Sequence, residues 1–331
     1  MIEVENLVKK YGSHLAVNHL SFKVEPGKIY GFLGPNGAGK STTMNIITGY
    51  IAATEGSVKI NGYDIMKDAE EAKKCIGYLP EVPPLYQDMT VTEYLTFVAR
   101  LKKIPRAEQQ TQIAEVMNLT MISDISGRLI RNLSKGYKQR VGLAQAVLGY
   151  PEVIILDEPT AGLDPKQIIE IRDFIKKLGE KHTVILSSHI LSEVQAVCDE
   201  IMILSKGQLV ASDTPAGLMG LMNGGISLEI SILGKKEQVE AVLKGFDRIQ
   251  GYRFEKENEE GIVKLVIETD KEDDIREALF YALAENRLPV MSMNRLEKSL
   301  EDIFLKLTGN EPGKEDDSNH RTGGESHDSD L

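Results

Sequence analysis

The sequence predicts an α/β protein in which a large layered domain precedes a smaller α+β domain. Two patterns support this fold class. From residue 1 to about 215, short apolar segments typical of strands alternate with helical stretches. The following part, residues 226–308, has the order strand, helix, strand, strand, helix, strand, helix, which is typical of a small ferredoxin-like domain.

The first domain is expected to be built on buried strands. Val153–Leu156 (VIIL) is apolar throughout, which suits a strand covered on both faces of a parallel sheet. Lys206-Gly207 separates two apolar runs and predicts a hairpin turn. The other expected elements are strands at Lys28–Leu33 and Thr183–Ser187, a helix at Ser41–Tyr50, the hairpin over Ile201–Ser212 and a mostly polar helical region over Thr92–Gly149.

A change in composition near Leu221–Gly225 indicates a linker between the two domains. Residues 310–331 are rich in glycine, serine and aspartate and have almost no apolar residue. We expect this end to be a disordered acidic tail. The expected limits are therefore 1–220 for the first domain and 226–308 for the second. Within the second, helices are expected at 236–246, 273–284 and 297–307, and strands at 227–233, 249–254, 262–267 and 288–293.

Composition excludes several classes of function. The 331-residue chain has a net charge of −11, and the tail contributes much of it with seven acidic and two basic residues. The remaining body is mildly acidic, whereas a nucleic-acid surface needs a basic stripe, so we expect no nucleic-acid partner. No apolar run approaches the ~20 residues of a membrane span, so a membrane role requires partner subunits. Cys75 and Cys198 form no metal-binding spacing and are expected to be buried and reduced.

A phosphate-binding loop is predicted at Gly34–Thr42, GPNGAGKST, between an expected strand and an expected helix. Its glycines let backbone N–H groups surround a phosphate, and the following helix directs its positive end to the same place. Lys40 would bridge the β- and γ-phosphates, and the Ser41 hydroxyl would ligate Mg²⁺. The expected nucleotide-binding residues of the loop are Gly34, Asn36, Gly37, Ala38, Gly39, Lys40, Ser41 and Thr42.

Two carboxylates follow the strand Val153–Leu156, in the segment PEVIILDEPT. Asp157 at the strand end is expected to hold Mg²⁺ through a water molecule. Glu158, one residue later, is expected to act as the general base for a water that attacks the γ-phosphate. At this point GTPases, kinases and helicase-like motors all remain open.

Leu133–Arg140, LSKGYKQR, resembles the signature of the ABC ATPase family and lies just before the acidic strand end, as in that family. AGLD at Ala161–Asp164 and the lone His189 after a strand complete the resemblance, which covers about residues 2–215. The sequence has no guanine-reading N-K-x-D motif, which disfavours a GTPase. The resemblance implies a P-loop nucleotide-binding domain of the ABC type with a helical subdomain, and ATP and Mg²⁺ as cofactors.

The resemblance also implies roles for residues outside the phosphate loop. Ser134 and Gly136, at the start of a helix, would face ATP held by a second subunit, and Asp164 would lie along the seam between the two. His189 resembles the histidine that contacts the γ-phosphate and orders the attacking water. Tyr11 resembles the aromatic residue that stacks on adenine. The partner is then a homodimer copy or a similar ATPase subunit in a heterodimer.

The chain departs from the usual family pattern at three positions. Glu81 stands where a glutamine usually contacts Mg²⁺; its carboxylate is a good metal ligand, but when ionised it cannot donate a hydrogen bond. Lys135 and Tyr137 replace a glycine and a glutamine of the signature. These variants, and the ending at Leu296–Gly309, resemble the exporter branch whose membrane subunits are separate polypeptides.

The favoured function is therefore an ATP-hydrolysing motor, peripheral on the cytoplasmic face of the cell membrane, that drives export through separate permease subunits. The region Val82–Arg100 is expected to contact those subunits. A soluble ABC ATPase acting on ribosomes or DNA is one alternative, and a regulatory subunit that binds ATP without hydrolysing it is another. The C-terminal domain is expected to support dimerisation or limit opening, and a merely stabilising role is equally compatible with its sequence.

Overall fold

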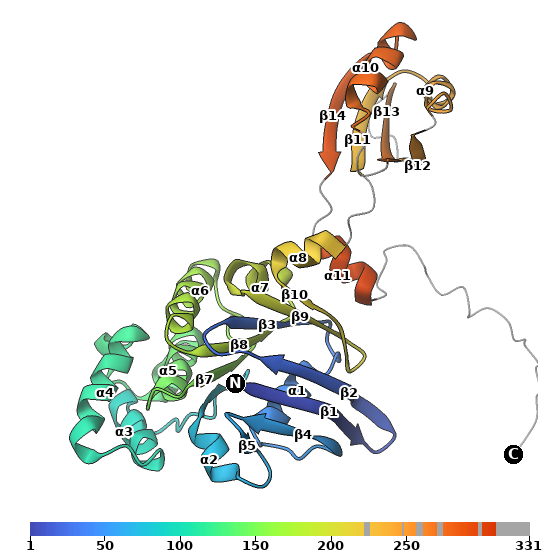
Figure 1. Cartoon of the computed structure of the whole chain (residues 1–331). Coiled ribbons are helices and arrows are strands. Elements are labelled where there is room, and N and C mark those ends of the chain that lie inside the picture. Colours follow the sequence, from blue (N-terminus) through green and yellow to red (C-terminus); the bar gives the residue numbers. More distant parts are fainter. Residues whose placement is uncertain (222–225, 247, 256–260, 270–273, 297–299, 309–331) are drawn as a thin grey trace, which may run out of the picture.

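The computed structural model describes residues 1–221, 226–246, 248–255, 261–269, 274–296 and 300–308. Figure 1 shows a large α/β part that contains the N-terminus and a smaller unit that also combines strands and helices. The expected linker at 221–225 and the expected acidic tail at 310–331 lie almost wholly outside the described residues. Among the described residues, no helix combines the length and the apolarity needed to cross a membrane.

A six-stranded sheet forms the centre of the large part. Its strands lie in the order β10-β9-β3-β8-β7-β6, and all neighbours are parallel except β10 and β9, which form the predicted hairpin. Every residue of β3, β7 and β8 is buried, as expected for strands covered on both faces. The strands are β3 (Ile29–Leu33), β6 (Ile76–Leu79), β7 (Val153–Asp157), β8 (Thr183–Ser188), β9 (Glu200–Ser205) and β10 (Gln208–Asp213).

A second, antiparallel sheet has the order β2-β1-β4-β5 and was not expected from the sequence. Its buried side chains share one apolar core with α1 (Lys40–Ile47) and with one face of the central sheet, as Phe22, Phe32 and Met44 illustrate. The core therefore fixes α1 between the two sheets. The strands are β1 (Ile2–Tyr11), β2 (His14–Val24), β4 (Glu55–Ile60) and β5 (Tyr63–Asp64).

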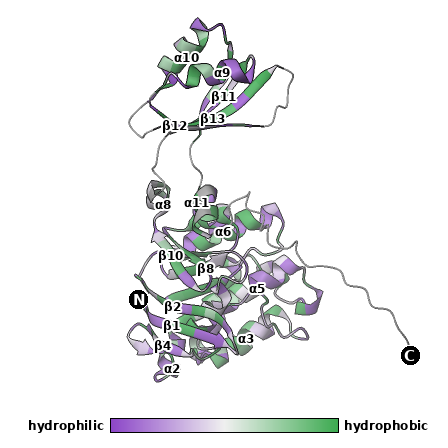
Figure 2. Cartoon of the chain, turned by 90° about the vertical axis from the view of Figure 1, so that its right-hand side faces the viewer, coloured by the Kyte–Doolittle hydropathy of each residue, from purple (hydrophilic) through white to green (hydrophobic). Residues whose placement is uncertain are grey.

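The polar region over Thr92–Gly149, which was predicted to be helical, consists mainly of the helices α3, α4 and α5. Thr90 caps α3 with a reciprocal pair of hydrogen bonds to Glu93, which fixes the start of this helical subdomain. Figure 2 shows hydrophobic segments on the strands inside the large part and a hydrophilic α2 outside. The helices of this part are α2 (Ala69–Lys74), α3 (Val91–Leu101), α4 (Arg106–Leu119), α5 (Lys135–Val147), α6 (Pro165–Gly179), α7 (Leu191–Val197) and α8 (Pro215–Leu221).

The smaller unit has an antiparallel sheet in the order β12-β13-β11-β14 and an apolar core of its own. Its elements are β11 (Ile226–Leu233), α9 (Lys236–Leu243), β12 (Ile249–Phe254), β13 (Ile262–Thr269), α10 (Arg276–Glu285) and β14 (Val290–Leu296). The final helix α11 (Leu300–Thr308), expected within this unit, instead packs on α8, β9 and β10. Leu300 and Ile303 are buried in the large core of the first part, because the apolar face of α11 has its partners there.

Candidate functional site

The loop between β3 and α1 has a backbone that requires glycine. Gly37 and Gly39 have positive φ angles of 80° and 98°, a conformation that other residues rarely adopt. At Gly39 a Cβ atom would also lie 2.6 Å from the carbonyl oxygen of Ala16 on β2. The loop therefore closes tightly against the neighbouring strand and presents its backbone at the start of α1.

The Lys40 side chain is buried within this loop and is 6% exposed. Its ammonium group donates a hydrogen bond to the carbonyl oxygen of Gly34 at 2.7 Å and lies 3.9 Å from Oε1 of Glu158. Burial lowers the pKa of Lys40, while the carboxylates of Glu158 and Asp157 act in the opposite direction. A buried cation held mainly by backbone carbonyls is well suited to bind an anion.

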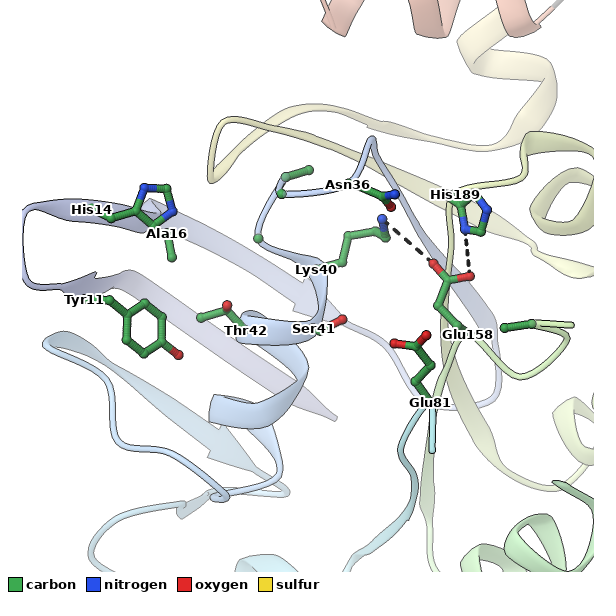
Figure 3. Close-up of a pocket in the computed structure, with 14 residues that line it drawn as sticks. Tyr11, His14, Ala16, Asn36, Lys40, Ser41, Thr42, Glu81, Glu158 and His189 are labelled. Atoms are coloured by element: carbon green, nitrogen blue, oxygen red, sulfur yellow. Dashed lines mark hydrogen bonds and ion pairs between the residues drawn. The ribbon is translucent and has the colours of Figure 1, made fainter. Parts of the chain in front are cut away.

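Asp157 is the last residue of β7 and Glu158 follows it; they are 4% and 8% exposed. Glu158 has a positive φ of 47°, a strained conformation for a residue with a side chain. Ser187 on β8 holds this turn, because its hydroxyl accepts a hydrogen bond from the Glu158 N–H at 3.0 Å and donates one to Asp157. The strained turn directs the Glu158 carboxylate toward the phosphate loop (Figure 3).

His189 directly follows β8 and completes a chain of three charged or polar side chains. Its Nδ1 lies 3.0 Å from Oε2 of Glu158, so Glu158 stands between Lys40 and His189 (Figure 3). The imidazole remains 47% exposed at the side chain and can therefore contact a ligand in the loop. The parallel sheet causes this meeting, since the carboxyl ends of β3, β7 and β8 lie side by side.

A cavity of about 360 Å³ opens over the loop and includes most of the residues predicted to bind nucleotide. Three further residues line it that were not predicted to bind nucleotide, namely His14, Ala16 and Ala161, the first residue of the AGLD segment. His14 is paired with Tyr11 across a two-residue hairpin turn, and this turn was the only signal in the sequence. The predicted residues in the lining are Tyr11, Asn36, Gly37, Ala38, Gly39, Lys40, Ser41, Thr42, Glu81, Glu158 and His189.

The predicted metal ligands provide only oxygen donors. The Ser41 hydroxyl donates to Oδ1 of Asp157 at 3.3 Å, so these two groups already lie together beside the loop. Glu81 lines the same cavity from the end of β6. Within the described ranges, no cluster of three or more His, Cys, Asp or Glu side chains could hold a metal alone. A hydroxyl with one or two carboxylates fits Mg²⁺, which prefers few protein ligands together with substrate phosphates.

Ser134, Gly136 and Asp164 form a second group, which does not line this cavity. Ser134 caps α5 by accepting a hydrogen bond from the Tyr137 N–H at 3.4 Å, and Asp164 caps α6 by accepting one from Gln167 at 2.9 Å. Gly136 packs so closely on Gln167 that a Cβ atom would lie 2.6 Å from its side-chain oxygen. The starts of α5 and α6 are therefore locked together, apart from the phosphate loop.

A neighbouring cavity of about 630 Å³ shares Ser41 and Glu81 with the first, is also lined by Asp157, and extends toward the helical subdomain. Its margin includes Tyr50 and Val82, which are both 79% exposed. Large apolar side chains exposed at the rim of a groove indicate an interaction surface.

The sequence of the chain is similar to those of known proteins. A family profile described as ABC transporter matches residues 17–161. The chain is 36% identical to the bacitracin transport ATP-binding protein BcrA of Bacillus licheniformis, over 93% of this chain and 97% of that protein. It is 31% identical to the linearmycin resistance ATP-binding protein LnrL of Bacillus subtilis (strain 168), over 93% of this chain and 98% of that protein.

Solved structures resemble the first part of the chain. An ATP-binding subunit of an ABC transporter matches with a TM-score of 0.62 and 30% identity, covering 67% of this chain and 92% of that one. A dimeric ATP-binding cassette in a post-hydrolysis state with ADP and Pi matches with a TM-score of 0.59 and 26% identity, covering 65% of this chain and 98% of that one.

Proposed function

Because the chain belongs to the ABC transporter family as an ATP-binding subunit, we propose that it is the motor of an exporter whose membrane-spanning permease is a separate polypeptide. ATP binding closes a dimer of two such subunits, and ATP hydrolysis opens it again. The observation that carries this proposal is the position of Glu158, which lies between Lys40 of the phosphate loop and His189.

Family membership confirms the resemblance inferred from LSKGYKQR, AGLD and His189. It also confirms the predicted P-loop fold of the first part and the predicted ATP-hydrolysing activity, since the structural relatives include a cassette with ADP and Pi. The permease partner and the location on the inner membrane face are part of our proposal. The names of the relatives refer to transport of bacitracin and resistance to linearmycin, and we propose export as the direction here.

ATP is proposed to bind with its phosphates in the loop Gly34–Thr42 and its adenine on Tyr11. Lys40 exchanges its contact with the Gly34 carbonyl for the phosphate oxygens. Tyr11 is 49% exposed at the edge of the cavity. The ammonium of Lys9 lies over its ring, 5.1 Å from the centroid, and adenine is proposed to stack on the opposite face. Ser41, Asp157 and Glu81 are the residues proposed to hold Mg²⁺, which would neutralise phosphate charge when bound.

Glu158 is the proposed general base. A water beside the carboxylate transfers a proton to Glu158 as its oxygen attacks the γ-phosphorus, and the bond from the γ-phosphorus to the β,γ-bridging oxygen breaks to leave ADP and phosphate. His189 keeps Glu158 oriented through its Nδ1 contact and contacts the γ-phosphate with the other ring nitrogen. The strained turn at Glu158 supports this role, because strain at such a position is held by its surroundings.

The second group, Ser134, Gly136 and Asp164, is proposed to complete the ATP site of the partner subunit. The start of α5 is a positive helix end, which suits the γ-phosphate of a nucleotide bound elsewhere. A homodimer and a heterodimer with a similar subunit both provide this arrangement. The exposed rim at Tyr50 and Val82, together with the segment to Arg100, is the proposed contact with the permease.

The smaller unit is proposed to be a ferredoxin-like domain that supports dimerisation or limits how far the dimer opens. Its strand order and its helices after β11 and β13 support that assignment. We propose that the first domain comprises residues 1–220 together with α11, which packs into its core, and that the second comprises residues 226–296.

The direct test of the proposed chemistry is Glu158→Gln. The variant should bind ATP within about 3-fold of wild type, while its turnover should fall by about 100-fold or more, the contribution of a general base. Glu180→Gln, at the exposed end of α6, is the matched control and should leave both quantities unchanged. A near-normal rate of ATP hydrolysis by Glu158→Gln would refute the assignment of the base.

A further inference from the structure

Glu193 is a buried carboxylate, bonded to the loops that carry Glu158 and His189, that the hydrolysis step does not use. It lies on α7, five residues after the end of β8, and is 5% exposed. Among the described residues it forms no ion pair. A buried charge without a cation costs free energy unless hydrogen bonds compensate it, so its partners indicate why it is there.

The partners of Glu193 are two buried hydroxyl groups. Oε2 accepts hydrogen bonds from Oγ1 of Thr160 at 2.5 Å and from Oγ of Ser188 at 3.0 Å. The Ser188 oxygen accepts the N–H of Ile190 at 3.0 Å, so its own proton is directed to Glu193. Thr160 and Ser188 are 5% and 1% exposed, which makes these charge-assisted bonds independent of solvent.

The two hydroxyl groups belong to the two loops that carry the proposed catalytic residues. Thr160 lies two residues after Glu158, and Ser188 directly precedes His189. A single carboxylate oxygen therefore joins the loop after β7 to the end of β8. Glu158 and His189 also contact each other above this junction, at 3.0 Å.

The backbone conformation of Glu158 explains why contacts are needed at this junction. The positive φ of Glu158 is strained, and only surrounding contacts keep such a conformation populated. Ser187 holds the turn from one side, through the Glu158 N–H. Glu193 holds it from the other side, through Thr160. The position of Glu193 in the first turn of α7, near the positive helix end, reduces the cost of its burial.

We propose that Glu193 is a positioning residue that holds the Glu158 loop and the His189 loop in register for ATP hydrolysis. The inference rests on the proposed function of Glu158 and His189. Glu193 touches neither ATP nor the attacking water. Its effect reaches the reaction through Thr160 on one side and Ser188 on the other.

The test compares Glu193→Ala with Glu193→Gln in the full-length protein. Glu193→Ala should lower kcat by about 10-fold or more and leave ATP affinity within about 3-fold, because the phosphate loop is untouched. Glu193→Gln keeps one acceptor oxygen of the same size and should recover part of the loss. Glu180→Gln serves as the charge-matched control. Equal losses of kcat and ATP affinity, or an unchanged kcat, would overturn the proposal.

The NMR chemical shifts of the His189 imidazole report on its surroundings in the folded protein. A general loss of stability does not change them. They are assigned by comparison with His189→Gln and followed by NMR at a temperature where each variant is folded. Glu193→Ala should shift them, and Thr160→Val, which removes one hydroxyl with little change of shape, should shift them in the same direction. Unchanged His189 resonances together with a lowered melting temperature would assign Glu193 a purely structural role.

A double variant separates this inference from the proposed function. If Glu193 acts through Glu158, Glu193→Ala should cause no further loss in single-turnover hydrolysis when added to Glu158→Gln. A further 10-fold loss in the double variant would contradict the proposed route. Should Glu158→Gln itself hydrolyse ATP normally, the assignment of the base fails, while the His189 resonances still report on the junction.

Discussion

Lys40 is held in the folded chain by carbonyl oxygens that the phosphates of ATP would replace. The contact with Gly34 keeps the ammonium in the loop, and the negative charges of Glu158 and Asp157 oppose the lowering of its pKa by burial. The same arrangement explains why the loop tolerates a buried cation before ligand binds. The nucleotide site thus combines contacts within the loop after β3 with carboxylates at the end of β7.

Lys40→Ala should weaken ATP binding by about 100-fold or more, because one phosphate-bridging charge is lost from a site with little water. Equilibrium binding of a fluorescent ATP analogue measures the change. Lys23→Ala, an exposed lysine whose side chain is 69% accessible, is the control and should bind as wild type does. ATP affinity that survives Lys40→Ala would mean that the phosphates lie elsewhere.

Site residues that lie together in one sequence segment could be predicted from the sequence. Site residues that only the fold brings together could not. Gly34–Thr42 and Asp157-Glu158 carry their chemistry in one segment, and the structure brings these segments together at one sheet edge. Ser187 and Glu193 reach the site from positions 30 and 33 residues away from their partners. A buried serine or glutamate has no local signature, since its role depends on which strand lies beside it.

At the scale of elements, the continuous apolar strands of the large part were predicted, whereas its irregular antiparallel sheet was not. β3, β7 and β8 follow from continuous apolar runs. β1 lacks a regular alternation, because the register shifts three times along its pairing with β2 and Asn6 has a positive φ of 48°. Such bulges break the two-residue period on which sequence patterns depend. The antiparallel sheet that supports Tyr11 was therefore missed.

The cap of α3 gives a prediction at the same scale. Thr90→Ala removes the hydroxyl that accepts the Glu93 N–H and should lower the free energy of unfolding by about 1 kcal/mol. Chemical denaturation measures this change. Thr90→Ser retains the hydroxyl and should stay close to wild type. ATP affinity should be the same in all three proteins, since α3 does not line the nucleotide cavity. A loss in Thr90→Ser equal to that in Thr90→Ala would contradict the capping argument.

At the scale of the whole molecule, the smaller unit is inserted between two helices that pack together. α8 precedes it and α11 follows it, and α11 belongs to the core of the first part. The sequence predicted the order of elements in the smaller unit correctly. It placed α11 in that unit because chain order alone cannot show which core an amphipathic helix joins.

Because α11 packs in the first part, a deletion that retains α11 and a truncation that removes it should have different effects. Replacing residues 226–296 by a short flexible linker retains α11 and should leave ATP affinity within about 3-fold, because the smaller unit has its own core. Ending the chain at residue 225 also removes Leu300 and Ile303, whose burial stabilises by about 1.5–3 kcal/mol each, and should lower the melting temperature. Weakened ATP binding by the first protein would show that the smaller unit takes part in the site.

The measurement that tests the central claim most directly is an affinity purification of tagged Glu158→Gln from detergent-solubilised native membranes, with ATP and Mg²⁺. Lys40→Ala, which should not close around ATP, is the matched control. Our account predicts that a polytopic membrane protein is recovered in stoichiometric amount with Glu158→Gln. Recovery of ribosomes, of nucleic acid or of the tagged protein alone would contradict the role as a transporter motor.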